Sequence, residues 1–533
     1  MLFNSYAFIF FYLPVVLLGF FQLARVNHNY AAAWLALASL FFYGYWNPAY
    51  IGLLLGSIVC NYAFGLWIAK NRMQDSGFRI QGSNHKQQTT NPKQLLIVAI
   101  AANLALLGYY KYANFFVGNL NPLLGTDWNV ANIILPLGIS FFTFTQIAFL
   151  VDTYQGKVKE FNFIHYLLFV TYFPHLIAGP ILHHKEMMPQ FAHPKTYRFN
   201  AEHFSLGVTV FVLGLAKKLL LADSLAEFPG PIFASVQAGG QPMLFEAWIA
   251  ALSYSLQLYF DFSGYSDMAI GLSLMFNVRL PLNFHSPYQS VNIIEFWRRW
   301  HMTLSRFLRD YLYIPLGGNR HGTARRHLNL MATMLLGGLW HGAGWTFVIW
   351  GGLHGIYLVI NHSWQTIKRS LGWKDGGWLI RRLSVLLTFL AVVVAWVFFR
   401  APDLSSATSM LSGMAGLNGV SLSESAVTHL ASTFPQIGQQ VALNGLAPLS
   451  KVNPDRALIL IILGLWVVWG FPNVHQLLHS HQPTLEAIEP SRSRLIRLLA
   501  WRFTPGHAWL LATIFVTSAA FLTRVRDFIY FQF

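Results

Sequence analysis

The sequence is dominated by apolar stretches, each about long enough to cross the ~30 Å hydrocarbon core of a bilayer. They lie at residues 6–24, 31–46, 49–69, 95–113, 132–151, 163–180, 204–222, 243–271, 328–354, 383–399, 457–471 and 507–523. Only 11% of the 533 residues are charged, whereas about a quarter are charged in a soluble globular protein. The chain is therefore predicted to be an all-α polytopic membrane protein with about eleven transmembrane helices.

The distribution of charge predicts which loops face the cytoplasm. A net charge of +16 would suggest nucleic-acid binding in a soluble protein, but the basic residues here cluster in short loops between apolar stretches. That pattern is typical of positive-inside topology, so we expect no nucleic-acid partner. Residues 70–94 carry five Lys or Arg against one Asp, which predicts a cytoplasmic loop. Residues 401–454 contain one Lys and are predicted to be external, and the basic connection at 492–502 is predicted to be cytoplasmic.

Several apolar stretches are interrupted by proline and glycine. The stretch at 132–151 has Pro136 and Gly138 near its start, and the stretch at 163–180 contains Pro174, Gly179 and Pro180. Such breaks free backbone groups that lipid cannot satisfy, so these segments are predicted to face protein or water. No repeat of fixed period is present, and residues 1–533 are predicted to form one domain.

The segment 292–316 is too charged to span a bilayer and is predicted to be amphipathic. Its arginines are interleaved with large apolar side chains, which is typical of a helix that lies at an interface or plugs a cytoplasmic vestibule. The arginines are Arg298, Arg299, Arg306 and Arg309. They could bind a phosphorylated acyl carrier, because guanidinium matches phosphate in bidentate geometry. Plain topology or contact with lipid headgroups is an equal alternative.

Two histidines at membrane depth are the main candidates for chemistry. His301 lies in the amphipathic segment and His341 lies in GGLWHGAGWTF. Ionisable groups at that depth are costly unless they line a polar cavity, and a buried imidazole can act as a general base. Helical spacing would place Gly337, Gly338, His341 and Trp345 near one face. The alternative is that the glycines provide close helix packing and His341 bonds a neighbouring carbonyl.

A third histidine provides a comparison. His354 follows His341 by thirteen residues, which is ~20 Å along a continuous helix. It could share a reaction centre with His341 only if the helix breaks at Gly351 and Gly352, so His354 is predicted to be structural. His301 comes from another segment and could approach His341 across a cavity. Trp340 and Trp345 are the two tryptophans expected beside a reaction channel.

Asp261 and Asp267 lie in an otherwise apolar stretch. They could orient a histidine or bind a substrate hydroxyl, or they could pair with Arg298, Arg299 or another basic residue. No GxxxxGK[ST], GxSxG or HExxH motif is present, and His183 and His184 lack neighbours at zinc-like spacing. We therefore expect no metal site and no tightly bound cofactor.

Long motifs in this sequence resemble one family. YFDFSGYSDMAIG, NFHSPYQSVNIIEFWRRWHMTLSRFLRDYLYIPLGGNR and LWHGAGWTFVIWGGLHG are similar to the membrane-bound O-acyltransferases, in their alginate O-acetyltransferase branch. IAGPILHHKEMMPQF, YAFIFFYLPV and FIYFQF are similar to the same branch, so the resemblance runs from end to end. It implies a fold with a central tunnel between two funnels and a catalytic core at about 130–362. It also implies that His341 is the catalytic residue and that His301 is the second family position.

The resemblance also implies a reaction and a location. An acetyl group would move from acetyl-CoA or another cytoplasmic thioester donor across a bacterial inner membrane. A periplasmic acetyltransferase partner would then place it on an exopolysaccharide such as alginate. The related D-alanyl transfer proteins share both histidine motifs. Two alternatives remain open: a transporter or channel component whose His and Asp residues relay protons, and a scaffold that only recruits an acetyltransferase.

Overall fold

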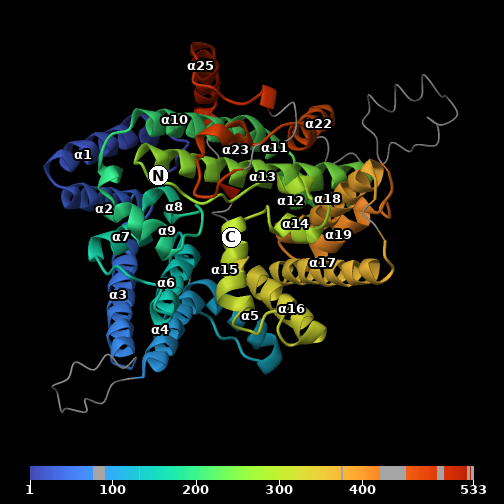
Figure 1. The fold of residues 1–533 in the computed structure, drawn as a ribbon. Coiled ribbons are helices and arrows are strands. Elements are labelled where there is room, and N and C mark those ends of the chain that lie inside the picture. Colours follow the sequence, from blue (N-terminus) through green and yellow to red (C-terminus); the bar gives the residue numbers. More distant parts are fainter. Residues whose placement is uncertain are drawn as a thin grey trace.

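The computed structural model describes residues 1–75, 91–130, 133–373, 376–420, 452–488, 497–524 and 528–529. Within these ranges the regular elements are helices, and no strand occurs (Figure 1). The prediction of an all-helical chain is therefore confirmed for the part of the chain that the structure describes.

The longest helix, α13 (Leu244–Met275), runs through the middle of the molecule alongside α10 (Ala201–Ala216) (Figure 1). The two helices approach closely because glycines face each other across the contact. A Cβ atom on Gly207 would lie 2.6 Å from the Gly271 carbonyl oxygen, and one on Gly214 would lie 2.8 Å from that of Gly264. Small residues let helix backbones approach in this way in membrane proteins.

The other helices surround this pair. Before α10 they are η1 (Ala7–Tyr12), α1 (Leu13–Val26), α2 (His28–Gly44), α3 (Ala49–Asp75), α4 (Pro92–Leu107), η2 (Gly108–Tyr112), α5 (Ala113–Leu124), α6 (Ile139–Tyr154), α7 (Phe163–Thr171), α8 (Phe173–Leu176), α9 (His184–Ala192) and η3 (Pro194–Tyr197). Between α10 and α13 are η4 (Lys217–Ala222), α11 (Asp223–Leu225) and α12 (Pro229–Gln237). After α13 come η5 (Pro287–Gln289), α14 (Ile293–Trp297), α15 (Met302–Leu308), η6 (Arg309–Tyr313), α16 (Gly322–His341), α17 (Trp345–Ser370), α18 (Trp378–Arg400), α19 (Leu404–Met414), α22 (Pro454–Gly470), α23 (Val474–Leu477), η8 (His479–His481), α25 (Pro505–Ala520) and η9 (Leu522–Arg524).

Five continuous helical runs in the described residues are long and apolar enough to cross a membrane. They are Ala7–Val26, Ala49–Met73, Pro92–Leu124, Ala201–Leu225 and Trp378–Arg400. Each coincides with a predicted stretch, which supports a multi-pass membrane protein. Other predicted stretches form shorter helices: α2 has 17 residues, and α6 and α25 have 16 each. About eleven spans and a central tunnel between two funnels remain predictions.

The structure divides three of the predicted segments into shorter helices. The stretch at 163–180 divides into α7 and α8, as its proline and glycine residues suggested. The stretch at 328–354 ends one helix at His341 and starts the next at Trp345, which the predicted single span did not foresee. The amphipathic segment at 292–316 is α14, α15 and η6 with a break at His301, and its Trp297 and Trp300 are buried in the core. It is not one helix lying on the surface.

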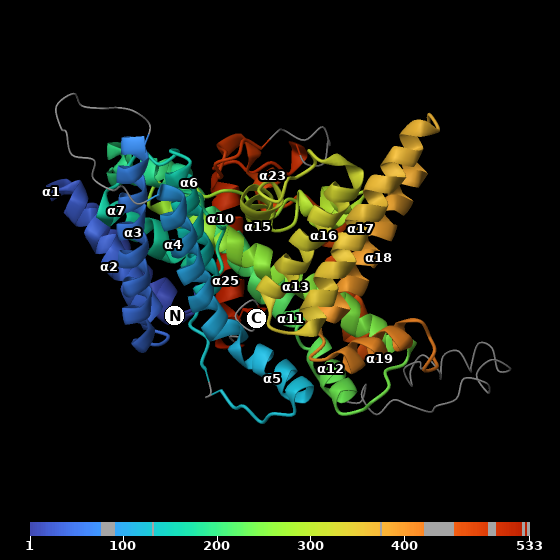
Figure 2. The same cartoon turned by 90° about the horizontal axis from the view of Figure 1, so that it is seen from below.

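The ends of the helices define two opposite edges of the molecule (Figure 2). The C-terminal end of α3 and the turn between α17 and α18 lie toward one edge, and α12 and α19 lie toward the other (Figure 2). Most of the predicted cytoplasmic loop at 70–94 and external loop at 401–454 lies outside the described residues, as does part of 492–502. The helices that precede the two loops, α3 and α19, lie toward opposite edges (Figure 2), and the sidedness of the loops stays a prediction.

Candidate functional site

His341 lies at the meeting point of the molecule's two hydrophobic clusters. It is the last residue of α16 and is 6% exposed. Its ring makes edge contacts with three aromatic rings at centroid distances of 4.9 Å (Trp340), 5.0 Å (Trp350) and 5.2 Å (Phe399). Trp340 belongs to the cluster built around the N-terminal helices, and Trp350 and Phe399 belong to the other cluster. The imidazole is thus held at a junction between two packed bodies of side chains.

A tight helical hairpin presents His341 at a chain break. The backbone is extended at Gly342 and Gly344, after which α17 folds back along α16. A Cβ atom on Gly338 would lie 2.3 Å from the Phe347 carbonyl oxygen, and one on Gly342 would lie 2.1 Å from the Phe347 ring. The glycines therefore provide close packing, and they do so around the histidine. Because the helix ends at His341, Trp345 does not share its face, contrary to the helical-spacing prediction.

His301 is held in an unusual backbone conformation. It precedes α15 with φ 42° and ψ 53°, in the left-handed region that a side chain with a Cβ atom rarely adopts. Its Nδ1 lies 3.2 Å from Asn283 Oδ1, and Thr303 Oγ1 donates to the same oxygen at 3.0 Å. Because Oδ1 can only accept, Nδ1 carries the hydrogen and Nε2 is the acceptor nitrogen of the ring. Strained residues of this kind concentrate at functional sites.

The structure brings the two predicted histidines next to one tryptophan. The Trp340 ring lies 6.4 Å from the His301 ring and 4.9 Å from the His341 ring, centroid to centroid. Phe144 stacks on Trp340 at 5.1 Å and fixes its plane. This arrangement agrees with the prediction that His301 approaches His341 from another segment, with Trp340 beside both.

His354 is closer to His341 than the sequence suggested. The assumption of a continuous helix was wrong, because the break after His341 turns α17 back and does not involve Gly351 or Gly352. The Trp350 ring lies 5.0 Å from His341 and 4.8 Å from His354. His354 is fully buried, and Tyr357 lies 5.8 Å beyond it. A continuous file of rings therefore runs from His341 to Tyr357.

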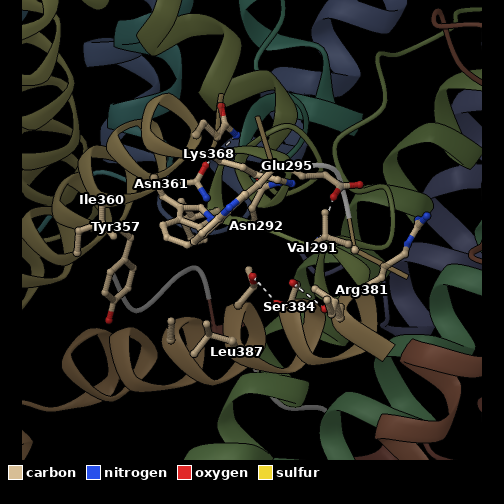
Figure 3. Close-up of a pocket in the computed structure, with 18 of the residues that line it drawn as sticks. Val291, Asn292, Glu295, Tyr357, Ile360, Asn361, Lys368, Arg381, Ser384 and Leu387 are labelled. Carbon is tan, nitrogen blue, oxygen red and sulfur yellow. Dashed lines mark hydrogen bonds between the residues drawn. The ribbon is translucent and has the colours of Figure 1, made fainter. Parts of the chain in front are cut away.

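That file ends at a large cavity between α14, α17 and α18 (Figure 3). The cavity has a volume of about 1340 Å³, and Tyr357, Lys368, Arg369 and Arg381 are among its lining residues. A second cavity of about 620 Å³ shares Arg369 and Glu295 with the first and is also lined by Arg298, Arg326 and His362. The lining of the second cavity carries more basic than acidic side chains, so this cavity favours an anionic ligand.

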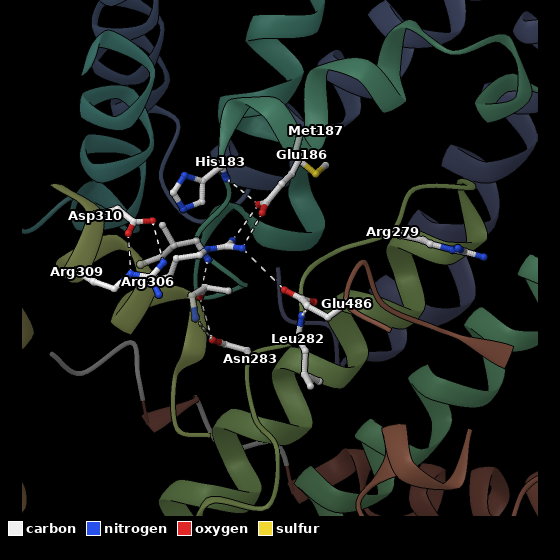
Figure 4. A network of polar contacts seen from close by, with 12 residues as sticks. His183, Glu186, Met187, Arg279, Leu282, Asn283, Arg306, Arg309, Asp310 and Glu486 are labelled. Atoms are coloured by element: carbon white, nitrogen blue, oxygen red, sulfur yellow. Dashed lines mark hydrogen bonds and ion pairs between the residues drawn. The ribbon is translucent and has the colours of Figure 1, made fainter. Parts of the chain in front are cut away.

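The four predicted arginines have different surroundings. Arg299 pairs with Glu295. Arg306 pairs with Glu186 at 2.7 Å, and Arg309 pairs with Asp310 at 2.7 Å (Figure 4). Among the described residues, Arg298 makes no ion pair, and it lines the second cavity. Arg326 and Arg369 join it there, although the sequence analysis did not identify them. The charge pattern of residues 292–316 could not show that arginines from α16 and α17 line the same cavity as Arg298.

Asp261 and Asp267 are engaged by lysines and not by the predicted arginines. Lys218 lies 2.5 Å from Asp261, and Lys217 lies 2.6 Å from Asp267, which also lies 2.9 Å from His475 Nε2. All three partners fit the prediction that the two carboxylates pair with a basic residue other than these arginines. Asp261 also accepts from the backbone N–H of Ile529 at 3.1 Å, so it ties the C-terminal segment to α13.

Trp345 lies away from the histidines. Its side chain is 54% exposed, and its indole Nε1 donates to Asn119 Oδ1 at 2.8 Å. Its ring packs 5.8 Å from Phe115, on α5. The structure thus places Trp345 at the contact between α5 and the hairpin, while Trp340 stays beside the histidines.

Two further histidines lie outside the membrane-spanning segments. Burial lowers the pKa of His183 to about 3, and the nearby Arg306 adds to the effect. Burial likewise lowers the pKa of His285 to about 4, with a contribution from Arg299. Both rings are therefore neutral near pH 7. Within the described ranges, no group of three or more His, Cys, Asp or Glu side chains could hold a metal ion.

The sequence analysis missed two residues next to His341. Lys111 Nζ donates to the carbonyl oxygens of Trp340 and His341, and Tyr112 donates to that of Leu339. The available signal was a lone lysine inside the apolar stretch at 95–113, since charged residues at membrane depth are costly and usually have a specific partner.

Comparisons of the sequence with known proteins show the family of this chain. Residues 40–399 match the sequence profile of MBOAT, the membrane-bound O-acyltransferase family. The chain is 46% identical over 450 residues to the peptidoglycan O-acetyltransferase of Helicobacter pylori, which covers 79% of this chain and 81% of the relative. It is 42% identical over 429 residues to the probable alginate O-acetylase AlgI of Pseudomonas aeruginosa, covering 80% and 76%. It is 29% identical to the teichoic acid D-alanyltransferase of Streptococcus thermophilus over 49% of this chain and 68% of the relative.

Proposed function

Because this chain belongs to the membrane-bound O-acyltransferase family and is an acyltransferase, we propose that it transfers acetyl groups from a cytoplasmic thioester to a bacterial polysaccharide. The observation that carries the proposal is that His301 and His341 both contact Trp340 and are both buried. Burial of the reacting groups keeps an activated thioester away from bulk water.

His341 is proposed as the general base. In the transfer, the acceptor oxygen forms a bond to the acetyl carbonyl carbon and the carbon–sulfur bond breaks. The hydroxyl proton passes to the imidazole of His341 and from there to the departing thiolate, so the products are an acetyl ester and a free thiol. His301, whose ring is fixed by the bond between Nδ1 and Asn283, helps to position the reacting groups for this step.

The donor is proposed to approach from the two adjoining cavities. Acetyl-CoA carries phosphates, and Arg298, Arg326 and Arg369 supply guanidinium groups that bind phosphate. The ring file through Tyr357, His354 and Trp350 connects this side to His341. A donor anchored in the cavities would direct its acyl end along that file.

The acceptor is proposed to be a polysaccharide hydroxyl outside the cytoplasm. The printed names of two similar proteins concern O-acetylation, of peptidoglycan in one and of alginate in the other. We place this chain in the inner membrane, embedded in lipid, with a periplasmic acetyltransferase partner that completes transfer to an exopolysaccharide such as alginate. The inner-membrane location would give the protein access to a cytoplasmic thioester and to an acceptor on the far side.

Acetyl transfer by the full chain in vesicles tests the function. The protein is reconstituted in lipid with labelled acetyl-CoA and a soluble polysaccharide acceptor, with and without a periplasmic acetyltransferase. Wild type should move label from thioester to ester, and His341→Ala should abolish this at unchanged protein level. His193→Ala, which changes an exposed histidine that lines neither cavity, should retain transfer. Normal acetylation by His341→Ala would refute the assignment.

The same assay separates the two alternatives. A scaffold would bind an acetyltransferase partner but would leave the labelled thioester intact when that partner is absent. A proton-relay transporter would dissipate a pH gradient across the vesicle without consuming thioester. Label moving from the thioester to ester, in a manner that depends on His341, contradicts both alternatives.

A further inference from the structure

The C-terminal end of α16 is held by two consecutive residues from a distant helix. Tyr112 Oη donates to the Leu339 carbonyl oxygen at 2.8 Å. Lys111 Nζ donates to the Trp340 carbonyl oxygen at 2.6 Å and to that of His341 at 3.0 Å. Three successive carbonyls of the last helical turn, ending at the proposed base, are thus satisfied by side chains of η2.

These bonds satisfy carbonyl groups that the helix break leaves without partners. The last four carbonyls of an α-helix have no partner within the helix, and the hydrocarbon core of a bilayer offers no water to satisfy them. The chain after His341 is extended at Gly342, so no further helical turn can supply donors. An ammonium group also interacts favourably with the negative end of the helix dipole.

Lys111 Nζ has three hydrogen-bond partners in the structure. A lysine ammonium has three N–H donors, and besides the two carbonyls Lys111 lies 3.4 Å from Ser140 Oγ on α6. Its Nζ also lies 5.9 Å from the centroid of the Trp340 ring. All of these contacts join α16, α6 and η2 around one point, which indicates that Lys111 sets positions and does not touch substrate.

We propose that Lys111 and Tyr112 are positioning residues for the acyl transfer: they clamp the last turn of α16 and thereby fix the imidazole of His341 against Trp340 and Trp350. The inference rests on the proposed function for its kinetic consequence, but the clamp itself is a property of the fold. The cost of placing a lysine inside an apolar helix is offset by the two carbonyl bonds that order the catalytic histidine.

Activity and backbone exchange together test the clamp. Lys111→Met keeps the length of the side chain but removes the charge and the donors, and Tyr112→Phe removes one hydroxyl. In full-length protein in lipid vesicles, Lys111→Met should lower kcat by about 10- to 100-fold with the KM for the donor unchanged, because ground-state binding of donor is not altered. Tyr112→Phe should lower kcat by about 3-fold. Amide hydrogen exchange of the peptide 335–344 should be faster in both variants, since the last turn loses its caps.

Asn119→Ala is the matched control. Asn119 follows the clamp on the same helical run and holds the other side of the break, through the bond from Trp345 Nε1 at 2.8 Å, but it touches no carbonyl of α16. It should retain wild-type kcat and wild-type exchange at 335–344. An equal loss in Asn119→Ala would mean that docking of the two helices, and not the clamp, is what matters.

The outcomes separate the clamp from the function. Wild-type kcat or wild-type exchange in Lys111→Met overturns the clamp. If that variant fails to accumulate in the membrane, Tyr112→Phe carries the same test, and wild-type values in it overturn the inference. If the wild-type protein transfers no acetyl group, the proposed function fails, while the exchange of 335–344 still decides whether the clamp exists.

Discussion

At the scale of single residues, the structure explains how His301 keeps a fixed ring orientation. Its backbone is in the left-handed region, and its Nδ1 is bound by Asn283 Oδ1. The same asparagine oxygen accepts from Thr303, and the Asn283 carbonyl oxygen accepts from the backbone N–H of Met302. One side chain therefore organises both the histidine and the start of α15.

Removal of the Asn283 side-chain acceptor should lower the rate of acetyl transfer but leave the amount of protein in the membrane unchanged. Asn283→Leu leaves His301 without the partner that fixes its tautomer, and loss of such outer partners typically costs about 10- to 100-fold in activity. Asn283→Asp keeps an acceptor oxygen and should lose less. The measurement is kcat for acetyl transfer in vesicles at matched protein levels.

Ser266→Ala controls for general damage around Asn283. Ser266 accepts from Asn283 Nδ2 at 3.3 Å, so the variant removes the amide's other partner and leaves the bond to His301 intact. It should keep activity within about 3-fold of wild type. Activity of Asn283→Leu as high as that of Ser266→Ala would show that the orientation of His301 does not matter.

The sequence could identify the histidines but not their surroundings. Membrane depth alone made His301 and His341 candidates, and the motif resemblance ranked them. Asn283, Lys111 and Tyr112 were out of reach because each acts through a backbone or side-chain contact with a residue at least 18 positions away. For Asp261 and Asp267 the sequence predicted a basic partner or a histidine, but it could not show that the partners are Lys218, Lys217 and His475 and not Arg298 or Arg299.

At the scale of elements, the hairpin of α16 and α17 depends on glycines that face a backbone. A Cβ atom on Gly351 would lie 2.3 Å from the Met334 carbonyl oxygen, where no side chain can move aside. On the adjacent Gly352, the nearest atom would be Leu335 Cδ2 at an ordinary 3.5 Å. Two neighbouring glycines thus occupy very different environments.

Gly351→Ala and Gly352→Ala should therefore differ sharply. Gly351→Ala forces the two helices apart, at a cost of about 1–3 kcal/mol for overpacking, and it should lower both the thermal midpoint and the acetyl transfer rate. Gly352→Ala should match wild type in both. Thermal unfolding in detergent, followed by tryptophan fluorescence, measures the first quantity. Equal midpoints for the two variants would contradict the packing described for this hairpin.

Element boundaries were predictable where proline marked them and not where glycine did. The break in 163–180 comes just before Pro174, which is in the first turn of α8, and an interruption of this stretch was expected. The break at Gly342 and Gly344 was not expected, because glycines in a membrane helix are equally compatible with continuous close packing. What decides between the two is the Phe347 ring, which packs against Gly342 and is visible only in three dimensions.

At the scale of the whole molecule, composition was enough to assign a multi-pass helical membrane protein, and five continuous helical runs are long and apolar enough to span. The relation between the site and the two faces could not be predicted. His341 joins two separate hydrophobic clusters, and the basic cavities lie between helices from different parts of the chain. Periodicity describes one helix at a time, whereas this arrangement depends on how helices pack together.

Sidedness is the property of the whole molecule that most constrains the proposed reaction. Donor entry from the cytoplasm requires the rim of the cavities, near the C-terminal end of α17, to share a face with the N-terminal end of α4. Ser370 and Lys93 are exposed at those two places, and Ser405 is exposed on α19 toward the opposite edge.

After replacement of the single cysteine, Cys60→Ala, each position can carry a cysteine in turn. A membrane-impermeant maleimide should label Ser370→Cys and Lys93→Cys in inside-out vesicles and Ser405→Cys in right-side-out vesicles. Labelling of Ser370→Cys together with Ser405→Cys from one side would place the cavities on the wrong face for a cytoplasmic thioester.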